Sequence, residues 1–149
     1  MFDMKTTRNR FEGFTLIEVL IVVVIMAVLA ATIIPQFTDS TKDARESSMV
    51  FNLHTLRAQI QLYKAQHAGN LPSADLAELI KGTNLDGSDG TKFGPYMQSI
   101  PVNSFTDSNT VTPIIGVTPV AGDVTSGGGW LYNATTGNIW IDHADHFTE

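Results

Sequence analysis

The 149-residue chain contains no cysteine, which excludes disulfide frameworks, thiolate zinc sites and cysteine nucleophiles. Charge is also scarce, because 16% of the residues are charged, against about 25% in an average soluble protein. The shortage is local: Glu18 is the one charged residue between Phe14 and Thr38. No Lys or Arg follows Lys92, and the formal net charge is −6. Since no basic patch stands out, the sequence predicts no binding of nucleic acid.

The longest apolar run extends from residue 14 to residue 34. A membrane-spanning helix needs about 20 mostly apolar residues, so this run is long enough. Two other interpretations compete: a buried core helix, for which the rest of the chain is small, and a secretory signal cleaved after Val28-Leu-Ala30. Lys5, Arg8 and Arg10 precede the run and favour a cytoplasmic N-terminus, with the acidic remainder outside. We therefore expect a single-pass membrane anchor.

Glu18 lies inside this apolar run. A carboxylate there costs about 2.5–3.5 kcal/mol on insertion scales, so the residue predicts a function and a partner. A position near the lipid headgroups would instead leave it solvated. If the chain were cut between Gly13 and Phe14, the new amine would lie one helical turn from Glu18. In a packed assembly, Glu18 of one subunit would then neutralise the Phe14 amine of a neighbour.

The stretch Arg10-Phe-Glu-Gly-Phe-Thr-Leu-Ile-Glu18 closely resembles the N-terminal signature of type IV prepilins and type II secretion pseudopilins. The resemblance implies a leader of residues 1–13, cut after Gly13 by a membrane prepilin peptidase that N-methylates Phe14. It also implies that Glu18 serves methylation or assembly. Pro35 stands where many pilins have a helix-loosening proline. Any proline inside a helix removes one backbone donor and should kink or locally melt the helix.

Downstream of the membrane segment, residues 39–68 predict an amphipathic continuation of the helix that stops at Gly69-Asn70. Its apolar positions recur every three or four residues: Val50, Leu53, Leu56, Ile60 and Tyr63. Ser73 as an N-cap and Gly82 as a stop predict a short helix. Its inward-facing residues would be Leu76, Leu79 and Ile80.

Residues 110–120 and 129–141 predict short strands, and the second stretch reads as a hairpin with Trp130 and Trp140 as packing residues. We therefore expect an α+β chain: a long N-terminal helix with a small antiparallel sheet packed on its second half, as in the pilin fold. The expected division is a leader (1–13), a transmembrane and assembly helix (14–38), its amphipathic continuation (39–68) and a globular region (69–149). Gly94-Pro-Tyr96 is similar to a segment of major pseudopilins.

The remaining candidate sites each have a simpler interpretation. Asp86 and Asp89 offer two carboxylates to a hard cation, but a solvated turn is the simpler explanation. The resemblance implies that calcium can bind in such proteins, yet no residue here can be assigned to it, so we expect no defined cofactor or metal residue. The C-terminal tail carries side chains of the types that bind transition metals, but a solvated tail explains them: Asp142, His143, Asp145 and His146. His54 and His67 on the predicted helix fit ordinary helix contacts.

Asn133-Ala-Thr135 fits a glycosylation sequon and equally a hairpin turn. The sequence contains no nucleophile elbow, P-loop or zinc-protease motif, so it predicts no catalytic residue and no enzyme.

The resemblance implies a structural subunit that is stored in the bacterial inner membrane with its C-terminal region in the periplasm. It would polymerise into a periplasmic filament for type II secretion, and the lack of cysteine favours this over a disulfide-stapled pilus. The implied partners are further copies, the prepilin peptidase, an inner-membrane assembly platform and the lipid bilayer. A type IV pilin for adhesion, motility or DNA uptake is one alternative. A monomeric, membrane-anchored periplasmic binding domain is the other.

Overall fold

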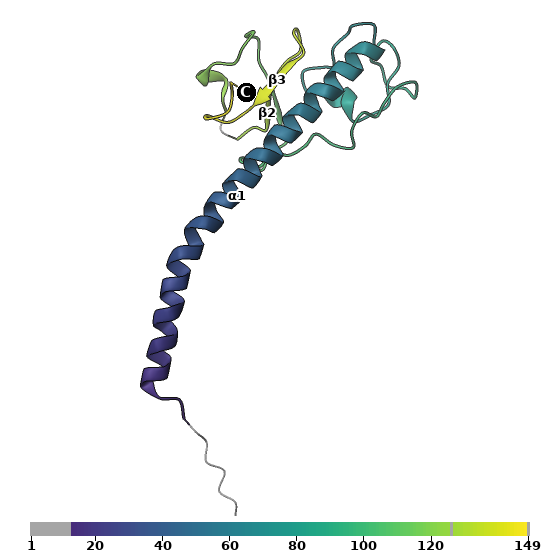
Figure 1. Ribbon diagram of the computed structural model, residues 1–149. Helices are drawn as coiled ribbons and strands as arrows, with labels where there is room; N and C mark the ends of the chain where they lie inside the picture. The colour runs from purple at the N-terminus through teal and green to yellow at the C-terminus, as the bar shows by residue number, and fades with distance from the viewer. Residues whose placement is uncertain (1–12, 126, 149) are drawn as a thin grey trace, which may run out of the picture. The chain divides into compact units, whose positions relative to one another are not determined.

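The structure, a computed structural model, describes residues 13–125 and 127–148, so most of the expected leader lies outside the described residues. The chain divides into two compact units, one up to Thr41 and one from Lys42 onward. Helix α1 (Leu16–Gln66) contributes its first part to the former and its second part to the latter (Figure 1). No glycine interrupts this stretch, and Pro35 is the one residue in it that disfavours a helix.

In the second unit, α1 buries one stripe of side chains: Met49, Leu53, Leu56, Ile60 and Tyr63. This confirms the predicted amphipathic helix, with one correction. Met49, rather than Val50, occupies the first buried position, and Val50 is only half-buried. The reason is that Met49 lies four residues before Leu53 and shares its face, whereas Val50 is rotated by about 100°.

The predicted end of α1 is confirmed. Ala68 and Gly69 adopt left-handed backbone conformations, with φ values of 54° and 90°. The amide of Gly69 donates to the Lys64 carbonyl at 2.9 Å, which satisfies one of the last free carbonyls of the helix. This turn sends the chain back along α1.

The small sheet has the order β1-β2-β3, with β1 at Val111–Pro113, β2 at Trp130–Asn133 and β3 at Asn138–Ile141. The β2–β3 hairpin is antiparallel as predicted. Strand β1 instead pairs in parallel with β2, so the expectation of a purely antiparallel sheet is wrong and the sheet is mixed. A parallel pair needs a long crossover, and residues 114–129, which include the short helix η2 (Ala121–Asp123), supply it.

The two faces of the sheet bury different clusters, because strand side chains alternate between faces. Trp130, Tyr132, Ile139 and Ile141 join the buried stripe of α1 in the main core. Leu131 and Trp140 point the other way and pack with Ile114, Val124 and Phe147. The α+β class is thus confirmed, and β2 and β3 lie beside the C-terminal part of α1 in Figure 1.

The helix predicted between residues 71 and 82 is wrong. That stretch contains only a single turn of 3-10 helix, η1 (Ala77–Leu79), preceded by Leu76 in a left-handed conformation. The Ser73 hydroxyl donates to the carboxylates of Asp75 and Glu78 instead of capping a helix. Serine and aspartate side chains that bond locally in this way compete with helical hydrogen bonds. Leu76 and Leu79 are buried as expected, whereas Ile80 is exposed.

Candidate processing and assembly site

The junction between Gly13 and Phe14 lies outside regular secondary structure, just before α1. Phe14 is 88% exposed, and no atom outside its chain neighbours comes within 4 Å of a Cβ placed on Gly13. Among the described residues neither helical hydrogen bonds nor packing covers this peptide bond, so it is open to another molecule.

Thr15 and Glu18 form a reciprocal cap at the start of α1. The Thr15 amide and hydroxyl both donate to Glu18 Oε2 at 2.8 Å, and the Glu18 amide donates to Thr15 Oγ1 at 3.3 Å. This is a capping box, in which two free backbone amides of the helix end are satisfied by side chains. The residue that sequence reasoning missed is Thr15, although its Thr-x-x-Glu spacing is the known signal for such a box.

Glu18 also lines a shallow groove together with Phe14 and three valines, Val19, Val22 and Val23. It is the one ionisable side chain of this groove. The carboxylate therefore stands at the helix N-terminus, where the helix dipole favours negative charge, with apolar side chains around it. Such a site is suited to hold a cationic group carried by an apolar body.

Beyond this site, the apolar side chains in the first part of α1 are exposed. Residues Leu16–Ile34 form the one helical stretch, among the described residues, that is long and apolar enough to cross a membrane. None of it is buried within the chain, which argues against the core-helix interpretation. The Thr32 hydroxyl donates to the Leu29 carbonyl at 2.9 Å, so this polar group is satisfied inside the helix. The segment is thus suited to contact lipid or to pack against neighbouring apolar helices.

Pro35 lies within the helical range of α1, and helical structure continues on both sides of it. The kink that the sequence predicts at this proline stays a prediction.

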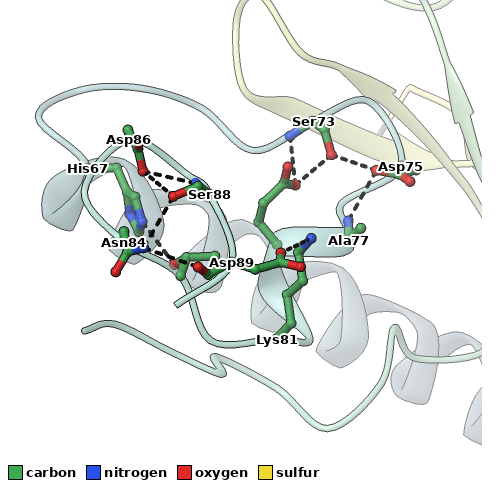
Figure 2. A network of polar contacts seen from close by, with 11 residues as sticks. His67, Ser73, Asp75, Ala77, Lys81, Asn84, Asp86, Ser88 and Asp89 are labelled. Carbon is green, nitrogen blue, oxygen red and sulfur yellow. Dashed lines mark hydrogen bonds and ion pairs between the residues drawn. The ribbon is translucent and has the colours of Figure 1, made fainter. Parts of the chain in front are cut away.

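The two carboxylates proposed for a hard cation diverge. Asp86 Oδ1 accepts bonds from the hydroxyl and amide of Ser88, which lower its pKa. Asp89 instead pairs with Lys81 at 2.5 Å. Figure 2 shows the two carboxylates turned to these different partners. No group of three or more metal-ligating side chains occurs among the described residues.

His54 is exposed on α1, whereas the other histidines take structural positions. His67 is fully buried, stacks on Tyr63 with ring centroids 3.7 Å apart, and bonds the Tyr63 carbonyl and the Thr83 hydroxyl. His146 stacks on the ring of Phe105 and His143 lies tilted against it, with centroids 5.2 and 4.9 Å from the Phe105 centroid. His67 is therefore a core contact. His143 and His146 in the C-terminal tail are held against the protein instead of being fully solvated.

The proposed sequon is used as a hairpin turn. Asn133 is 2% exposed, and its side-chain oxygen accepts bonds from the amides of Thr135 and Thr136. Its side-chain nitrogen donates to the carbonyls of Ile115 and Gly116 at 3.2 and 2.8 Å. Because this nitrogen is buried and bonded, the side chain is not accessible for glycosylation in the folded protein.

Comparison with known proteins finds a family match for the N-terminal segment and relatives for a larger part of the chain. Residues 8–34 match the family model for the prokaryotic N-terminal methylation motif. Over 100 residues the chain is 31% identical to a type II secretion system core protein G of Pseudomonas aeruginosa, covering 64% of this chain and 69% of that protein. The chain therefore belongs to the type II secretion system core protein G family, and its relatives bear the names of structural components.

Other relatives align over shorter stretches. A type II secretion system core protein G of Dickeya chrysanthemi is 32% identical over 60 residues, which is 40% of this chain and 39% of that protein. The type IV narrow pilus major component PilA5 of Thermus thermophilus is 35% identical over 66 residues, which is 44% of this chain and 56% of that protein. The chain thus spans well under two thirds of these two relatives. No solved structure gives a significant match.

Proposed function

We propose that the protein is a structural pseudopilin subunit that is cut between Gly13 and Phe14 and N-methylated on Phe14. The match to the methylation motif is the observation that carries this proposal. The exposed, non-helical junction before α1 supports it, because a peptidase needs an unprotected peptide bond. The leader would carry Lys5, Arg8 and Arg10 and remain on the cytoplasmic side.

Before assembly, the subunit is stored in the inner membrane by the apolar stretch Leu16–Ile34, with the acidic C-terminal region in the periplasm. The uncovered apolar side chains of this stretch support a membrane anchor. Burial in lipid contributes about 25 cal/mol for each Å² of apolar surface. Summed over this stretch, that contribution far exceeds the cost of placing the Glu18 carboxylate at the end of the membrane segment.

In the assembled state, Glu18 pairs with the Phe14 amine of a neighbouring subunit. Methylation keeps that amine cationic, so the attraction survives it. The capping box supports this pairing, because both of its bonds to the carboxylate go to Oε2 and hold the side chain in one place. Among the described residues nothing donates to Oε1, which leaves that oxygen for an incoming amine. Two apolar helices packed around the pair would strengthen it by excluding water.

The assembly is a helical, periplasmic filament that works with an inner-membrane platform to drive type II protein secretion. The relationship to the core protein G family favours this function. A type IV pilin for adhesion, motility or DNA uptake is the second candidate, since pilus proteins are related at comparable identity. A monomeric, membrane-anchored binding domain is the third, and it predicts no filament at all.

The intact mass of the mature protein from its native cells tests the processing step. We expect a chain that begins at Phe14 and carries one additional methyl group. A mature chain that begins at Met1 or Ala31 would overturn the proposal. Deleting the subunit in those cells separates the functions: loss of protein export supports secretion, and loss of surface fibres with normal export supports a pilus.

A further inference from the structure

The C-terminal region contains the loops in which the resemblance to major pseudopilins would place a calcium ion. Calcium takes about six to eight oxygen ligands, chiefly carboxylates and backbone carbonyls, at about 2.3–2.6 Å. Within the described residues, the carboxylates that follow Lys92 are those of Asp107, Asp123, Asp142 and Asp145. A site for the ion needs several of these groups to be close together and free of other partners.

Asp142 is the one carboxylate that the described part of the chain buries completely. Its two oxygens already have donors, because the Thr125 amide donates to Oδ1 at 2.8 Å and the Thr125 hydroxyl donates to Oδ2. The Thr125 hydroxyl in turn accepts a bond from the Gly128 amide at 3.0 Å. A Cβ built on Gly128 would lie 2.1 Å from Oδ2, so the Gly128 backbone packs directly against this oxygen. An ion beside Asp142 would have to displace these donors and this backbone.

The carbonyls of the same loop are engaged by protein donors as well. The Thr106 hydroxyl donates to the Gly128 carbonyl at 2.9 Å, and the side-chain nitrogen of Asn103 donates to the Gly129 carbonyl at 3.0 Å. The Asp142 amide also donates to the Gly129 carbonyl, at 3.2 Å. These bonds join three segments of the chain: the turn before β1, the crossover and the residue after β3. The loop is therefore closed by hydrogen bonds between protein groups.

The remaining acids do not complete a cation site. Asp123, within the crossover, accepts a bond from the Val120 amide on Oδ2 at 2.9 Å. Asp107 and Asp145 are exposed. Within the part of the chain that the structure describes, no three metal-ligating side chains come together, and no buried side-chain nitrogen or oxygen lacks a hydrogen-bond partner. The described residues of these loops therefore do not fit a calcium ion.

We propose that the Asp142–Thr125 pair, with its bonds to Gly128, holds the crossover in place of a calcium ion, and that the subunit folds and stays assembled without calcium. A buried polar network whose members all have partners is rigid and needs no further ligand. The consequence for filaments rests on the proposed function, whereas the consequence for folding concerns the single chain.

Calcium titration of the full chain, purified in detergent, tests the proposal. Urea unfolding is followed by tryptophan fluorescence in excess EGTA and in increasing calcium chloride. We expect the same midpoint in every solution, because an ion that bound only the folded state would raise the midpoint as its concentration rose. Equilibrium dialysis against calcium chloride should leave no stoichiometric calcium on the chain. A midpoint that rises with calcium, or stoichiometric bound calcium, overturns the proposal.

Thr125→Val tests whether the pair holds the crossover. It removes the hydroxyl that donates to Asp142 and accepts from Gly128. It should shift the folding equilibrium at least about fivefold toward the unfolded chain, equally in EGTA and in calcium. Asp123→Asn is the matched control: it removes an acid of the same crossover, keeps an oxygen for the Val120 amide and should leave the midpoint unchanged in both solutions. An unchanged midpoint in Thr125→Val, a loss that calcium reverses, or an effect of Asp123→Asn in calcium alone overturns the proposal.

Sheared filaments separate this proposal from the function on which it rests. Filaments of the unmodified chain, taken from its native cells and washed with EGTA, should remain intact. Filaments that dissolve in EGTA and persist in calcium overturn the proposal and leave the filament function standing. Absence of filaments overturns the filament function, and the unfolding experiments then still decide whether folding needs calcium.

Discussion

The Glu18 carboxylate accepts two hydrogen bonds from Thr15, each 2.8 Å long, and both end on the same oxygen. An amide oxygen would accept these bonds as well, but it would carry no charge. The capping role of Glu18 and its proposed pairing with a neighbouring amine can therefore be separated by a substitution that keeps one and removes the other.

Glu18→Gln should leave membrane insertion and helix content intact and abolish incorporation into filaments. The glutamine still satisfies the Thr15 amide, so the loss of helix stability stays well below about 1 kcal/mol. The measurement is filament yield after shearing, beside the amount of subunit in the membrane fraction.

The matched control is Thr15→Val, which removes the hydroxyl bonds and keeps the charge. It should weaken the helix start and retain filaments at a reduced yield. Normal filaments from Glu18→Gln would refute the pairing, because only the charge is missing in that variant.

Asp142 anchors the crossover between β1 and β2. Its side chain is fully buried and accepts bonds from the amide of Thr125, at 2.8 Å, and from the Thr125 hydroxyl. Asp142→Ala should lower the free energy of unfolding by about 1–3 kcal/mol, because it removes a buried side chain and its two hydrogen bonds to Thr125. Urea unfolding of the full chain in detergent, followed by the fluorescence of the buried Trp130 and of Trp140, measures the change.

Two further variants check this interpretation of Asp142. A Cβ on Gly128 would lie 2.1 Å from Asp142 Oδ2, so Gly128→Ala should destabilise the same loop. Asp145→Ala, at an exposed position three residues away, should change stability by less than about 0.5 kcal/mol. Equal effects of the two aspartate variants would contradict an anchoring role.

His67 and Thr83 join the end of α1 to the following loop, with His67 Nε2 3.0 Å from the Thr83 hydroxyl and both side chains buried. His67→Phe and Thr83→Val should each destabilise the protein by about 1–3 kcal/mol, since each removes one partner of a buried hydrogen bond. The double variant should cost less than the two single effects together, because it removes both polar groups. Strict additivity in urea unfolding would show that the bond contributes nothing.

The pH dependence of stability should include Asp75. The Ser73 hydroxyl and then the Ala77 amide hold the pKa of Asp75 below its ordinary value of 3.8. A lowered pKa in the folded state contributes stability above the unfolded value, and that contribution is lost as the pH falls through the folded value. Asp75→Asn should therefore flatten the acid limb of the stability curve below about pH 4. The effect is small because Asp75 is exposed, and an unchanged acid limb would contradict it.

Local patterns predicted much of this fold. The three- and four-residue spacing of apolar side chains gave α1 and its buried stripe, apart from the one-residue shift from Val50 to Met49. The β2–β3 hairpin followed from two short apolar runs on either side of the Asn133-Ala-Thr-Thr-Gly137 turn. These predictions hold because helix periodicity and tight turns depend on residues close in sequence.

Other features were missed or wrong, because they depend on distant strand pairing or on competing local side-chain hydrogen bonds. The parallel pairing of β1 could not be read from three residues, and the helix predicted after Ser73 was lost to side-chain bonds with Asp75 and Glu78. At the N-terminal site, Glu18 was found from its charge alone. Its capping partner Thr15 was overlooked, although its spacing was visible in the sequence.

The sequence by itself determined the apolar helix, its single acid and the methylation motif, because these are properties of consecutive residues. The tertiary structure decided which polar groups are buried and paired. Asp142 accepts a hydrogen bond from Thr125, and Asn133 donates one to the Gly116 carbonyl. The residues of each pair are far apart in the chain and meet only in the folded structure. Burial removes water from those groups, and a buried polar group must then find a partner within the fold.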